Sequence, residues 1–208
     1  MNPMPLSPLF FATWLAENED QLRPPVNNYC LYQGNDFILM AVGGPNERND
    51  YHVNETEVCL QPSWCSREAN EQEWFYQVKG DMLLRVVENN AFRDIPIKEG
   101  EMFLLPGMCP VSLGESQANI NGSGNTPHNP VRFKDTIGLV MERQRPAGSR
   151  DRLRWYCTKG DHASPTIIRE EVFHCSDLGT QLKPIIEQWQ QDEDGRRCAE
   201  CSCIADPK

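Results

Sequence analysis

The sequence predicts a mainly β protein with the double-sheet architecture of a jelly roll. Short segments rich in β-branched and aromatic residues follow one another and are bounded by glycine, proline and asparagine. These segments do not alternate with long helical patterns, which argues against a parallel α/β sheet and favours a sandwich or barrel. The expected strands cover residues 29–42, 74–78, 82–87, 92–97, 102–105 and 136–142.

Helices are expected near the two ends of the chain. Phe10, Phe11, Trp14 and Leu15 recur at helical spacing, which indicates an N-terminal helix packed on the β domain. The composition changes after residue 145, and apolar residues at helical spacing between 182 and 189 predict a second helix. We therefore expect a β domain over residues 1–145 and a packed, helical C-terminal tail over residues 146–208.

Composition excludes several classes of partner. The 208-residue chain has a formal net charge of −10, so it has no electrostatic reason to bind nucleic acid or an anionic membrane surface. No apolar run approaches the ~18–20 residues that span a bilayer, and the N-terminus lacks the pattern of a secretory signal. A cytoplasmic protein is expected. The oligomeric state is left open, with a homodimer as one alternative.

Two histidines and a glutamate are the candidate metal ligands. His52, Glu73 and His128 lie on strand-like segments that are separated by glycine-containing turns. Two histidines and one carboxylate on one face of a metal, with the other positions open, typically hold non-haem ferrous iron in oxygenases.

The spacing around these residues is similar to the two cupin motifs. Six residues separate Glu73 from Gly80, and five separate Gly100 from Pro106. Together with the flanking segments, the chain resembles the 3-hydroxyanthranilate 3,4-dioxygenase family of the cupin superfamily. The resemblance rests on residues 48–57, 73–82, 99–106, 126–132, 138–143 and 153–157.

The resemblance implies a set of roles, a cofactor and a reaction. His52, Glu73 and His128 match the ligands of Fe(2+). Arg132 matches the residue that binds the substrate carboxylate, Arg48 a pocket arginine near dioxygen, and Glu142 a carboxylate near the substrate amine. Arg48, Glu73 and Glu142 are thus the expected catalytic residues, and Glu73, Arg132 and Glu142 the expected substrate contacts. The implied reaction opens the ring of 3-hydroxyanthranilate with dioxygen to give 2-amino-3-carboxymuconate semialdehyde, which leads to quinolinate and NAD on the kynurenine pathway.

Two segments interrupt the family pattern, residues 58–72 and 108–124. Val58 stands where the family spacing places the glutamate ligand, and removal of both segments restores continuous motifs. The codons of Val58-Cys59 and of Gly107-Met108-Cys109 can each contain GTATGT, a common intron start, so one hypothesis is that the segments are translated introns. A transcript that contains both segments would contradict it. If they belong to the protein, an alternative function is a catalytically impaired cupin that binds a small molecule or partner. A metal-dependent isomerase is a third alternative, and it would need no dioxygen.

The cysteine-rich end is a separate feature. Cys198 and Cys201 have the two-residue spacing of a zinc or rubredoxin-like knuckle. Some members of the resembled family carry two such pairs and bind a second metal. Here Cys157 is followed by Thr, Lys and Gly160, so the partner in the first pair is missing. His162, Cys175 or Cys203 could complete a site, but the spacing selects none, and a metal-free tail is the favoured expectation.

Overall fold

The fold is described from a computed structural model, which places residues 7–23, 27–34, 36–46, 48–54, 73–105, 126–145, 148–175 and 178–208. Eleven named strands and two α-helices occur in these ranges. The helices are α1 (Phe11–Asn18) and α2 (Leu178–Gln191), with short 3-10 turns at Glu19–Leu22 and Asp194–Arg196. The strands are β1 (Asn28–Gln33), β2 (Phe37–Gly43), β3 (Tyr51–Val53), β4 (Glu73–Lys79), β5 (Met82–Glu88), β6 (Ala91–Ile97), β7 (Met102–Leu105), β8 (His128–Arg132), β9 (Ile137–Arg143), β10 (Asp151–Tyr156) and β11 (Ile167–Phe173).

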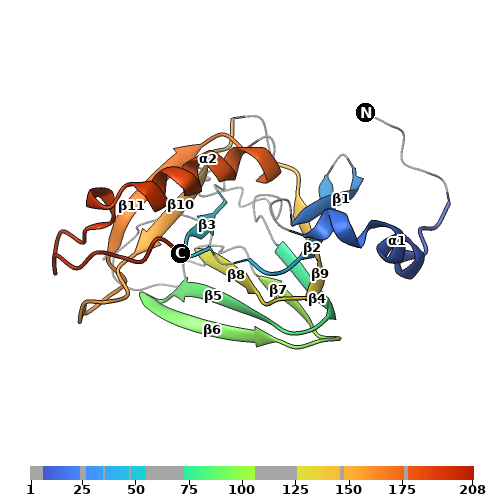
Figure 1. Cartoon of the computed structure of the whole chain (residues 1–208), viewed down its shortest axis with the longest axis horizontal. Coiled ribbons are helices and arrows are strands. Elements are labelled where there is room, and N and C mark those ends of the chain that lie inside the picture. The colour runs from blue at the N-terminus through green and yellow to red at the C-terminus, as the bar shows by residue number, and fades with distance from the viewer. Residues whose placement is uncertain are drawn as a thin grey trace, which may run out of the picture.

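Two antiparallel sheets face each other (Figure 1). One has the strand order β1-β2-β9-β4-β7 and the other β11-β10-β3-β8-β5-β6. Neighbours in space are therefore often distant in sequence, as in the β4–β9 and β3–β8 pairs. The predicted mainly β, double-sheet fold with helices near both ends is confirmed.

The main core fills the space between the sheets. Phe75 and Val140 from the five-stranded sheet pack against Met82, Leu84 and Val86 from the six-stranded sheet. On β4 every second side chain is buried, which is the period that places residues 73, 75 and 77 on one inward face. The same alternation positions Glu73 and Gln77 in the interior beside Phe75.

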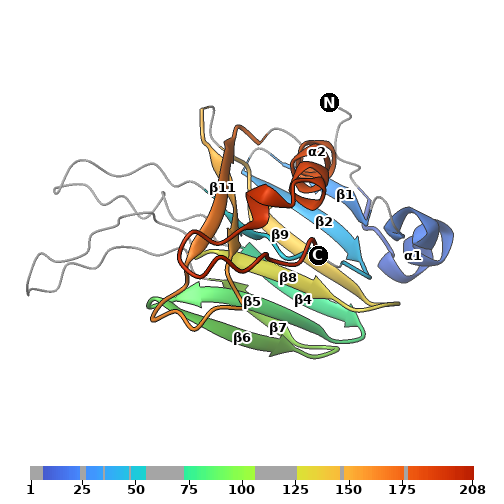
Figure 2. The same cartoon turned by 60° about the vertical axis from the view of Figure 1, so that its left-hand side comes forward.

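Helix α1 packs through three of the four predicted residues, whereas Phe10 precedes the helix and is 74% exposed. Phe11, Trp14 and Leu15 are partly buried against a small cluster of Leu22, Ala41 and Ile137. In both views α1 lies beside β1, at the end of the molecule opposite β11 (Figures 1 and 2).

The C-terminal part contributes more than the predicted helix. Strands β10 and β11 form a hairpin that the sequence did not lead us to expect, and β10 also pairs with β3. Helix α2 then packs Leu182 and Trp189 on Leu153 and Trp155 of β10, with the two indole centroids 4.8 Å apart. Residues after 146 thus extend the sheet that carries the first candidate ligand, because Leu153 pairs with His52.

Segments 58–72 and 108–124 lie outside the described residues, which stop at Asn54 and Leu105 and resume at Glu73 and Thr126. Among the described helices, none is long and apolar enough to cross a membrane.

Candidate active site

A pocket of about 110 Å³ lies between the two sheets. All six residues to which the sequence assigned a role contribute to its lining: Arg48, His52, Glu73, His128, Arg132 and Glu142. They come from β3, β4, β8 and β9, apart from Arg48, which precedes β3. Strand register explains the convergence, because His52 is paired with His128 and Glu73 with Glu142.

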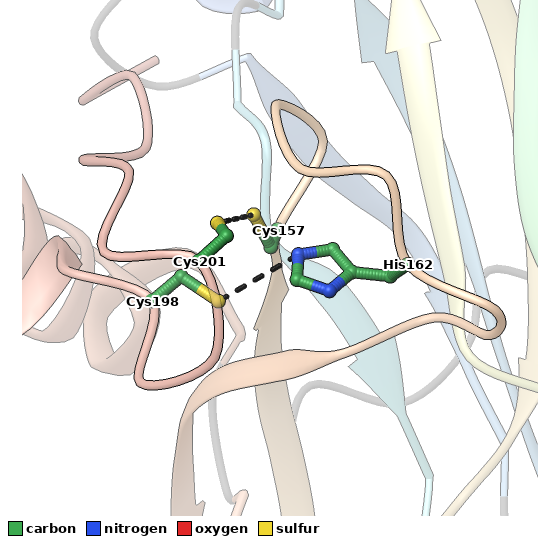
Figure 3. Close-up of side chains that lie close together, drawn as sticks. All are labelled: Cys157, His162, Cys198 and Cys201. Atoms are coloured by element: carbon green, nitrogen blue, oxygen red, sulfur yellow. Dashed lines mark hydrogen bonds between the residues drawn. The ribbon is translucent and has the colours of Figure 1, made fainter.

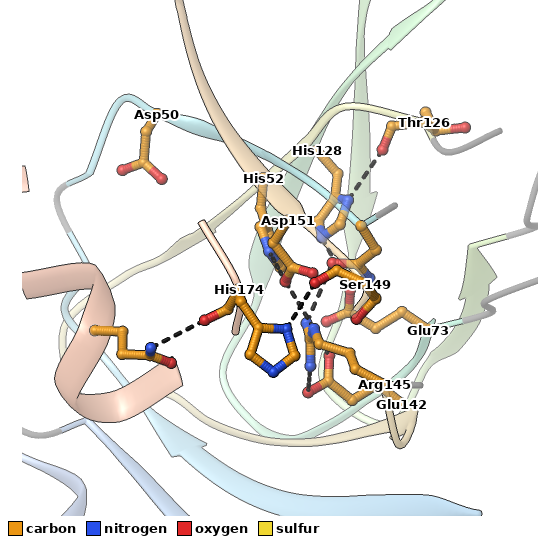
Figure 4. A network of polar contacts seen from close by, with 12 residues as sticks. Asp50, His52, Glu73, Thr126, His128, Glu142, Arg145, Ser149, Asp151 and His174 are labelled. Carbon is orange, nitrogen blue, oxygen red and sulfur yellow. Dashed lines mark hydrogen bonds and ion pairs between the residues drawn. The ribbon is translucent and has the colours of Figure 1, made fainter. Parts of the chain in front are cut away.

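His128 and Glu73 are in direct contact in the lining of the pocket. The distance from His128 Nε2 to Glu73 Oε2 is 2.9 Å, and both side chains are almost fully buried. His128 Nδ1 lies 3.0 Å from the carbonyl oxygen of Thr126, to which only an N–H can donate (Figure 4). Burial opposes the charge on His128, but the facing carboxylate outweighs it and raises the pKa of the imidazole.

His52 is held by a carboxylate that the sequence did not reveal. Its Nε2 lies 2.7 Å from Oδ2 of Asp151, the first residue of β10, which is fully buried. Burial lowers the pKa of His52, and Asp151 offsets only part of that effect. Within the described ranges, the ligand atoms of His52, Glu73 and His128 do not all come within 4.8 Å of one another.

Arg145 forms ion pairs with two buried carboxylates, Glu142 and Asp151. It donates from Nε to Asp151 Oδ2 at 2.7 Å and from Nη1 to Glu142 Oε1 at 3.0 Å (Figure 4). Burial raises the pKa of Glu142 despite this pairing, and the neighbouring Glu73 carboxylate acts in the same direction. Glu142 thus has an ion-pair partner three residues further along the chain, just after the end of β9.

Arg132 is a buried guanidinium held by a neutral group. It is 2% exposed, and its Nη1 donates to Gln77 Oε1 at 2.7 Å. Its Nη2 is buried without a hydrogen-bond partner. Gly138 makes room for this arrangement, because a Cβ there would lie 2.4 Å from both Arg132 Nη1 and Gln77 Oε1. Burial lowers the pKa of Arg132 to about 10.

Arg48 is placed at the pocket but is paired with its own neighbour. Its guanidinium makes two hydrogen bonds to the buried carboxylate of Asp50, one of them from Nε to Oδ1 at 2.9 Å. Burial opposes the charge on Arg48, but Asp50 outweighs it and raises the pKa of the guanidinium. The same loop is tied to β8, where Asn129 donates from Nδ2 to the carbonyl oxygen of Arg48 at 3.1 Å.

The pocket has the chemistry of a cation site at its Glu73–His128 side. Glu73 Oε2 is buried and receives no well-directed hydrogen bond, although His128 Nε2 is close. Two donor atoms bound to one cation at about 2.1 Å and at right angles lie about 3 Å apart, close to the observed separation. A ligating histidine also usually donates its second ring N–H to a carbonyl or carboxylate, as His128 does to Thr126. These residues fit a metal ion with oxygen and imidazole ligands.

Sequence reasoning missed three residues of the site, Gln77, Arg145 and Asp151. Side chains of a strand alternate between its two faces, so the position of Gln77, four residues after Glu73, could have identified it as a second inward-facing residue of β4. Arg145 and Asp151 follow β9 and begin β10, and only the pairing of β10 with β3 brings Asp151 to His52.

The chain matches known proteins over almost its whole length. The sequence model described as 3-hydroxyanthranilic acid dioxygenase matches residues 4–64, 65–122 and 117–190. A 3-hydroxyanthranilate 3,4-dioxygenase 2 of Aspergillus clavatus is 92% identical over 208 residues and covers 100% of both chains. A relative of the same name from Aspergillus fumigatus is 78% identical over 98% of each chain. A 3-hydroxyanthranilate 3,4-dioxygenase of Mycosarcoma maydis is 50% identical over 96% of this chain and 93% of that chain.

The comparisons also bear on the two interruptions. The match to the family model breaks between residues 64 and 65 and again at 117–122, inside the two segments that interrupt the motifs. The Aspergillus clavatus relative cannot lack the two segments together, because it is 92% identical over all 208 residues. The translated-intron hypothesis would therefore have to apply to that protein as well. By sequence and by the residues gathered in its pocket, the chain belongs to the 3-hydroxyanthranilic acid dioxygenase family.

Proposed function

We propose that this chain is an iron(II)-dependent 3-hydroxyanthranilate 3,4-dioxygenase. It opens the aromatic ring of 3-hydroxyanthranilate with both atoms of dioxygen and forms 2-amino-3-carboxymuconate semialdehyde. That product cyclises to quinolinate, which places the enzyme on the route from tryptophan to NAD. Family membership supports the reaction class, and the pocket supports its assignment to particular residues.

One observation carries the proposal. The buried guanidinium of Arg132, whose Nη2 has no hydrogen-bond partner, lines the same pocket as the Glu73–His128 pair. Leaving a buried charged group without its full set of partners is costly, so such a group marks a place where another molecule completes the contacts. An aromatic acid has a carboxylate for this guanidinium, and its hydroxyl and amine groups can bind a metal held by Glu73 and His128.

The roles of the substrate-facing residues follow from their surroundings. Arg132 keeps its charge because Gln77 orients it without neutralising it, so its fork can take the substrate carboxylate. Glu142, fixed by Arg145, is the proposed acceptor for the substrate amine. Arg48, fixed by Asp50, is the proposed positive group on the dioxygen side.

We assign His52, Glu73 and His128 as the ligands of Fe(2+). Bound iron would supply a centre at which substrate and dioxygen meet and exchange electrons. Asp151 and the Thr126 carbonyl fix the orientation of the two imidazoles, which is the usual task of groups behind metal ligands. Phe75 and Val140 on the pocket wall exclude water. We further propose a cytoplasmic location and leave a homodimer as the alternative to a monomer.

The test is turnover of 3-hydroxyanthranilate by the iron-loaded chain, followed by oxygen uptake and by absorbance of the ring-opened product. We expect both signals in air and neither under nitrogen. Product formation without dioxygen would favour an isomerase instead. Tight binding of 3-hydroxyanthranilate without turnover would favour the binding-module alternative.

Two matched variants test the assignment of Glu73 as an iron ligand. Glu73→Gln keeps the size of the ligand but removes its charge, and it is expected to lose iron and turnover together. Glu17→Gln, at an exposed position of α1, is the control and should keep both. Retention of iron and activity by Glu73→Gln would contradict the ligand assignment.

A further inference from the structure

The loop that carries Arg48 is attached to strand β8 by a buried asparagine. Asn129, the residue directly after His128, is 2% exposed. Its Nδ2 donates to the carbonyl oxygen of Arg48 at 3.1 Å and to the carbonyl oxygen of Asp50 at 2.5 Å. One side-chain amide therefore holds the two backbone carbonyls that flank Asn49, and it fixes the distance between this loop and β8.

The direction of the Asn129 amide follows from its partners. A carbonyl oxygen only accepts hydrogen bonds, so the NH2 end of the side chain must face the loop. The other end, Oδ1, is buried and has no hydrogen-bond partner among the described residues. Leaving a buried oxygen unpaired is costly. The side chain thus spends both of its N–H groups on the loop, which indicates that holding the loop is its main contribution.

The chain just before Arg48 also runs alongside β8. Asn46 donates from its backbone N to the carbonyl oxygen of Arg132 at 2.9 Å, and from Nδ2 to the carbonyl oxygen of Pro130 at 3.1 Å. Asn129 continues this attachment as far as Arg48. The guanidinium on the proposed dioxygen side is therefore placed relative to the strand that also carries the substrate-binding arginine.

The C-terminal tail contacts the same loop from its other side. Asn49 donates from Nδ2 to the carbonyl oxygen of Asp206 at 2.8 Å, and this hydrogen bond is exposed. Water competes for an exposed hydrogen bond, whereas the Asn129 contact with Asp50 is buried. We therefore expect the contact with β8 to restrain the loop more strongly than the contact with the tail.

The tail has an attachment of its own, at a cluster of three cysteines and a histidine (Figure 3). One ligand atom from each member lies within 4.8 Å of all the others; the members are Cys157, His162, Cys198 and Cys201. Of the three partners that the sequence left open, His162 joins the cluster, and Cys175 and Cys203 are outside it. The cluster joins the tail to the loop after β10, so the place of the tail does not depend on the Arg48 loop.

We propose that Asn129 is a positioning residue for the reaction of the pocket, and that it sets the place of Arg48 on the dioxygen side. It holds the backbone carbonyls of Arg48 and Asp50, while the Asp50 carboxylate orients the guanidinium. Asn129 follows the proposed iron ligand His128 directly, so one short stretch of β8 fixes the positive group relative to the iron site. This inference rests on the proposed function, because Arg48 has the role that is assigned to it there.

Steady-state kinetics of the iron-loaded full chain, with each substrate varied in turn, tests the proposal. Asn129→Ala removes both hydrogen bonds to the loop, so Arg48 is no longer held in place. We expect kcat/KM for dioxygen to fall about tenfold to 100-fold, while KM for 3-hydroxyanthranilate stays within about twofold. Iron content should not change. Asn129→Ser keeps one hydroxyl donor for the loop and should show an intermediate loss, which a general loss of packing does not predict.

A double-mutant cycle shows whether Asn129 acts through Arg48. Arg48→Gln keeps side-chain N–H groups for Asp50 but removes the positive charge. In this background Asn129→Ala should cause little further loss of kcat/KM for dioxygen, because the group that it positions is gone. Equal losses with and without Arg48 would overturn the proposal.

Two other asparagine variants are the controls. Asn18→Ala removes an N–H donor to a backbone carbonyl at the end of α1, that of Trp14 at 2.7 Å, and should change neither KM. Asn49→Ala removes the exposed contact with the tail and should lower kcat/KM for dioxygen less than about twofold. A loss in Asn49→Ala as large as that in Asn129→Ala would show that the tail places the loop, and it would contradict the proposal.

Circular dichroism and thermal unfolding establish that the variants are folded, and Asn129→Ser serves if Asn129→Ala is not. An unchanged kcat/KM for dioxygen in a folded Asn129 variant would refute the positioning role. So would an equal rise of KM for dioxygen and for 3-hydroxyanthranilate. Neither result touches the dioxygenase proposal, which is read out by turnover of 3-hydroxyanthranilate by the unchanged chain.

Discussion

Arg132 donates from Nη1 to the side-chain oxygen of Gln77 across 2.7 Å, and both residues are buried. Gln77 in turn donates from Nε2 to the carbonyl oxygen of Gly80 at 2.7 Å, which fixes the direction of its amide. The guanidinium is therefore positioned by a neutral partner and keeps its full charge for an incoming anion. A carboxylate partner would instead have neutralised that charge.

Replacing Gln77 by glutamate tests this relationship. In Gln77→Glu the new carboxylate competes with the substrate carboxylate for Arg132, so KM for 3-hydroxyanthranilate should rise about tenfold or more, or about 1.4 kcal/mol. The KM for 2-aminophenol, which lacks the carboxylate, should change much less. Gln188→Glu on an exposed position of α2 controls for net charge. Equal KM changes for both substrates would contradict the role given to Arg132.

The pKa of Arg132 predicts a pH dependence. Since burial lowers this pKa from 12.5 to about 10, the guanidinium is charged at neutral pH and loses its proton as the pH rises through about 10. KM for 3-hydroxyanthranilate should therefore be steady below pH 9 and rise near pH about 10. The depressed pKa makes Arg132 favour folding more as the pH rises, so its titration does not unfold the chain. Circular dichroism at each pH checks the fold, and a flat KM through this range would count against the assignment.

Asp151 is expected to act through His52. The variant Asp151→Asn removes the charge that orients the imidazole and that pairs with Arg145. Loss of a group behind a metal ligand typically costs about 10–100-fold in metal affinity, and we expect a loss in that range for iron. Iron affinity is measured by competition with a chelator. Asp94→Asn, in an exposed pair between Arg85 of β5 and Asp94 of β6, should have no effect, and an equal loss in both variants would refute the specific role.

The tail helix should contribute strongly to stability. Trp189 is 1% exposed and stacks on Trp155 at an interplanar angle of 17°. Trp189→Ala should lower the free energy of unfolding by about 3–5 kcal/mol, as measured by urea denaturation. Phe10→Ala removes a side chain that is 74% exposed and should change it by less than about 0.5 kcal/mol. Similar effects of the two changes would show that α2 is not part of the folding unit.

Local patterns predicted much of the fold and part of the site. Aromatic and β-branched residues at 74–78, followed by a glycine turn, predicted β4, because such residues favour strands and glycine favours the turn that ends one. The hairpin of β10 and β11 was not foreseen, since charged residues interrupt the apolar pattern of both strands. Asp151 could not be placed from sequence, because its partner His52 is 99 positions away and only the pairing of β10 with β3 brings the two together. The sequence named His162 as one of three candidate partners of Cys198, but the spacing alone did not select it.

Steady-state turnover of 3-hydroxyanthranilate by the complete, iron-loaded 208-residue chain tests the central claim most directly. A version that lacks residues 58–72 and 108–124 is measured beside it. We predict that the complete chain consumes dioxygen and forms the ring-opened product at a rate within the usual range for enzymes, about 1–1000 per second. If only the shortened version turned over, the assignment of the site residues would stand, but the claim that the 208-residue chain is an active dioxygenase would be contradicted. Absence of turnover from both, with iron bound, would contradict the dioxygenase account itself.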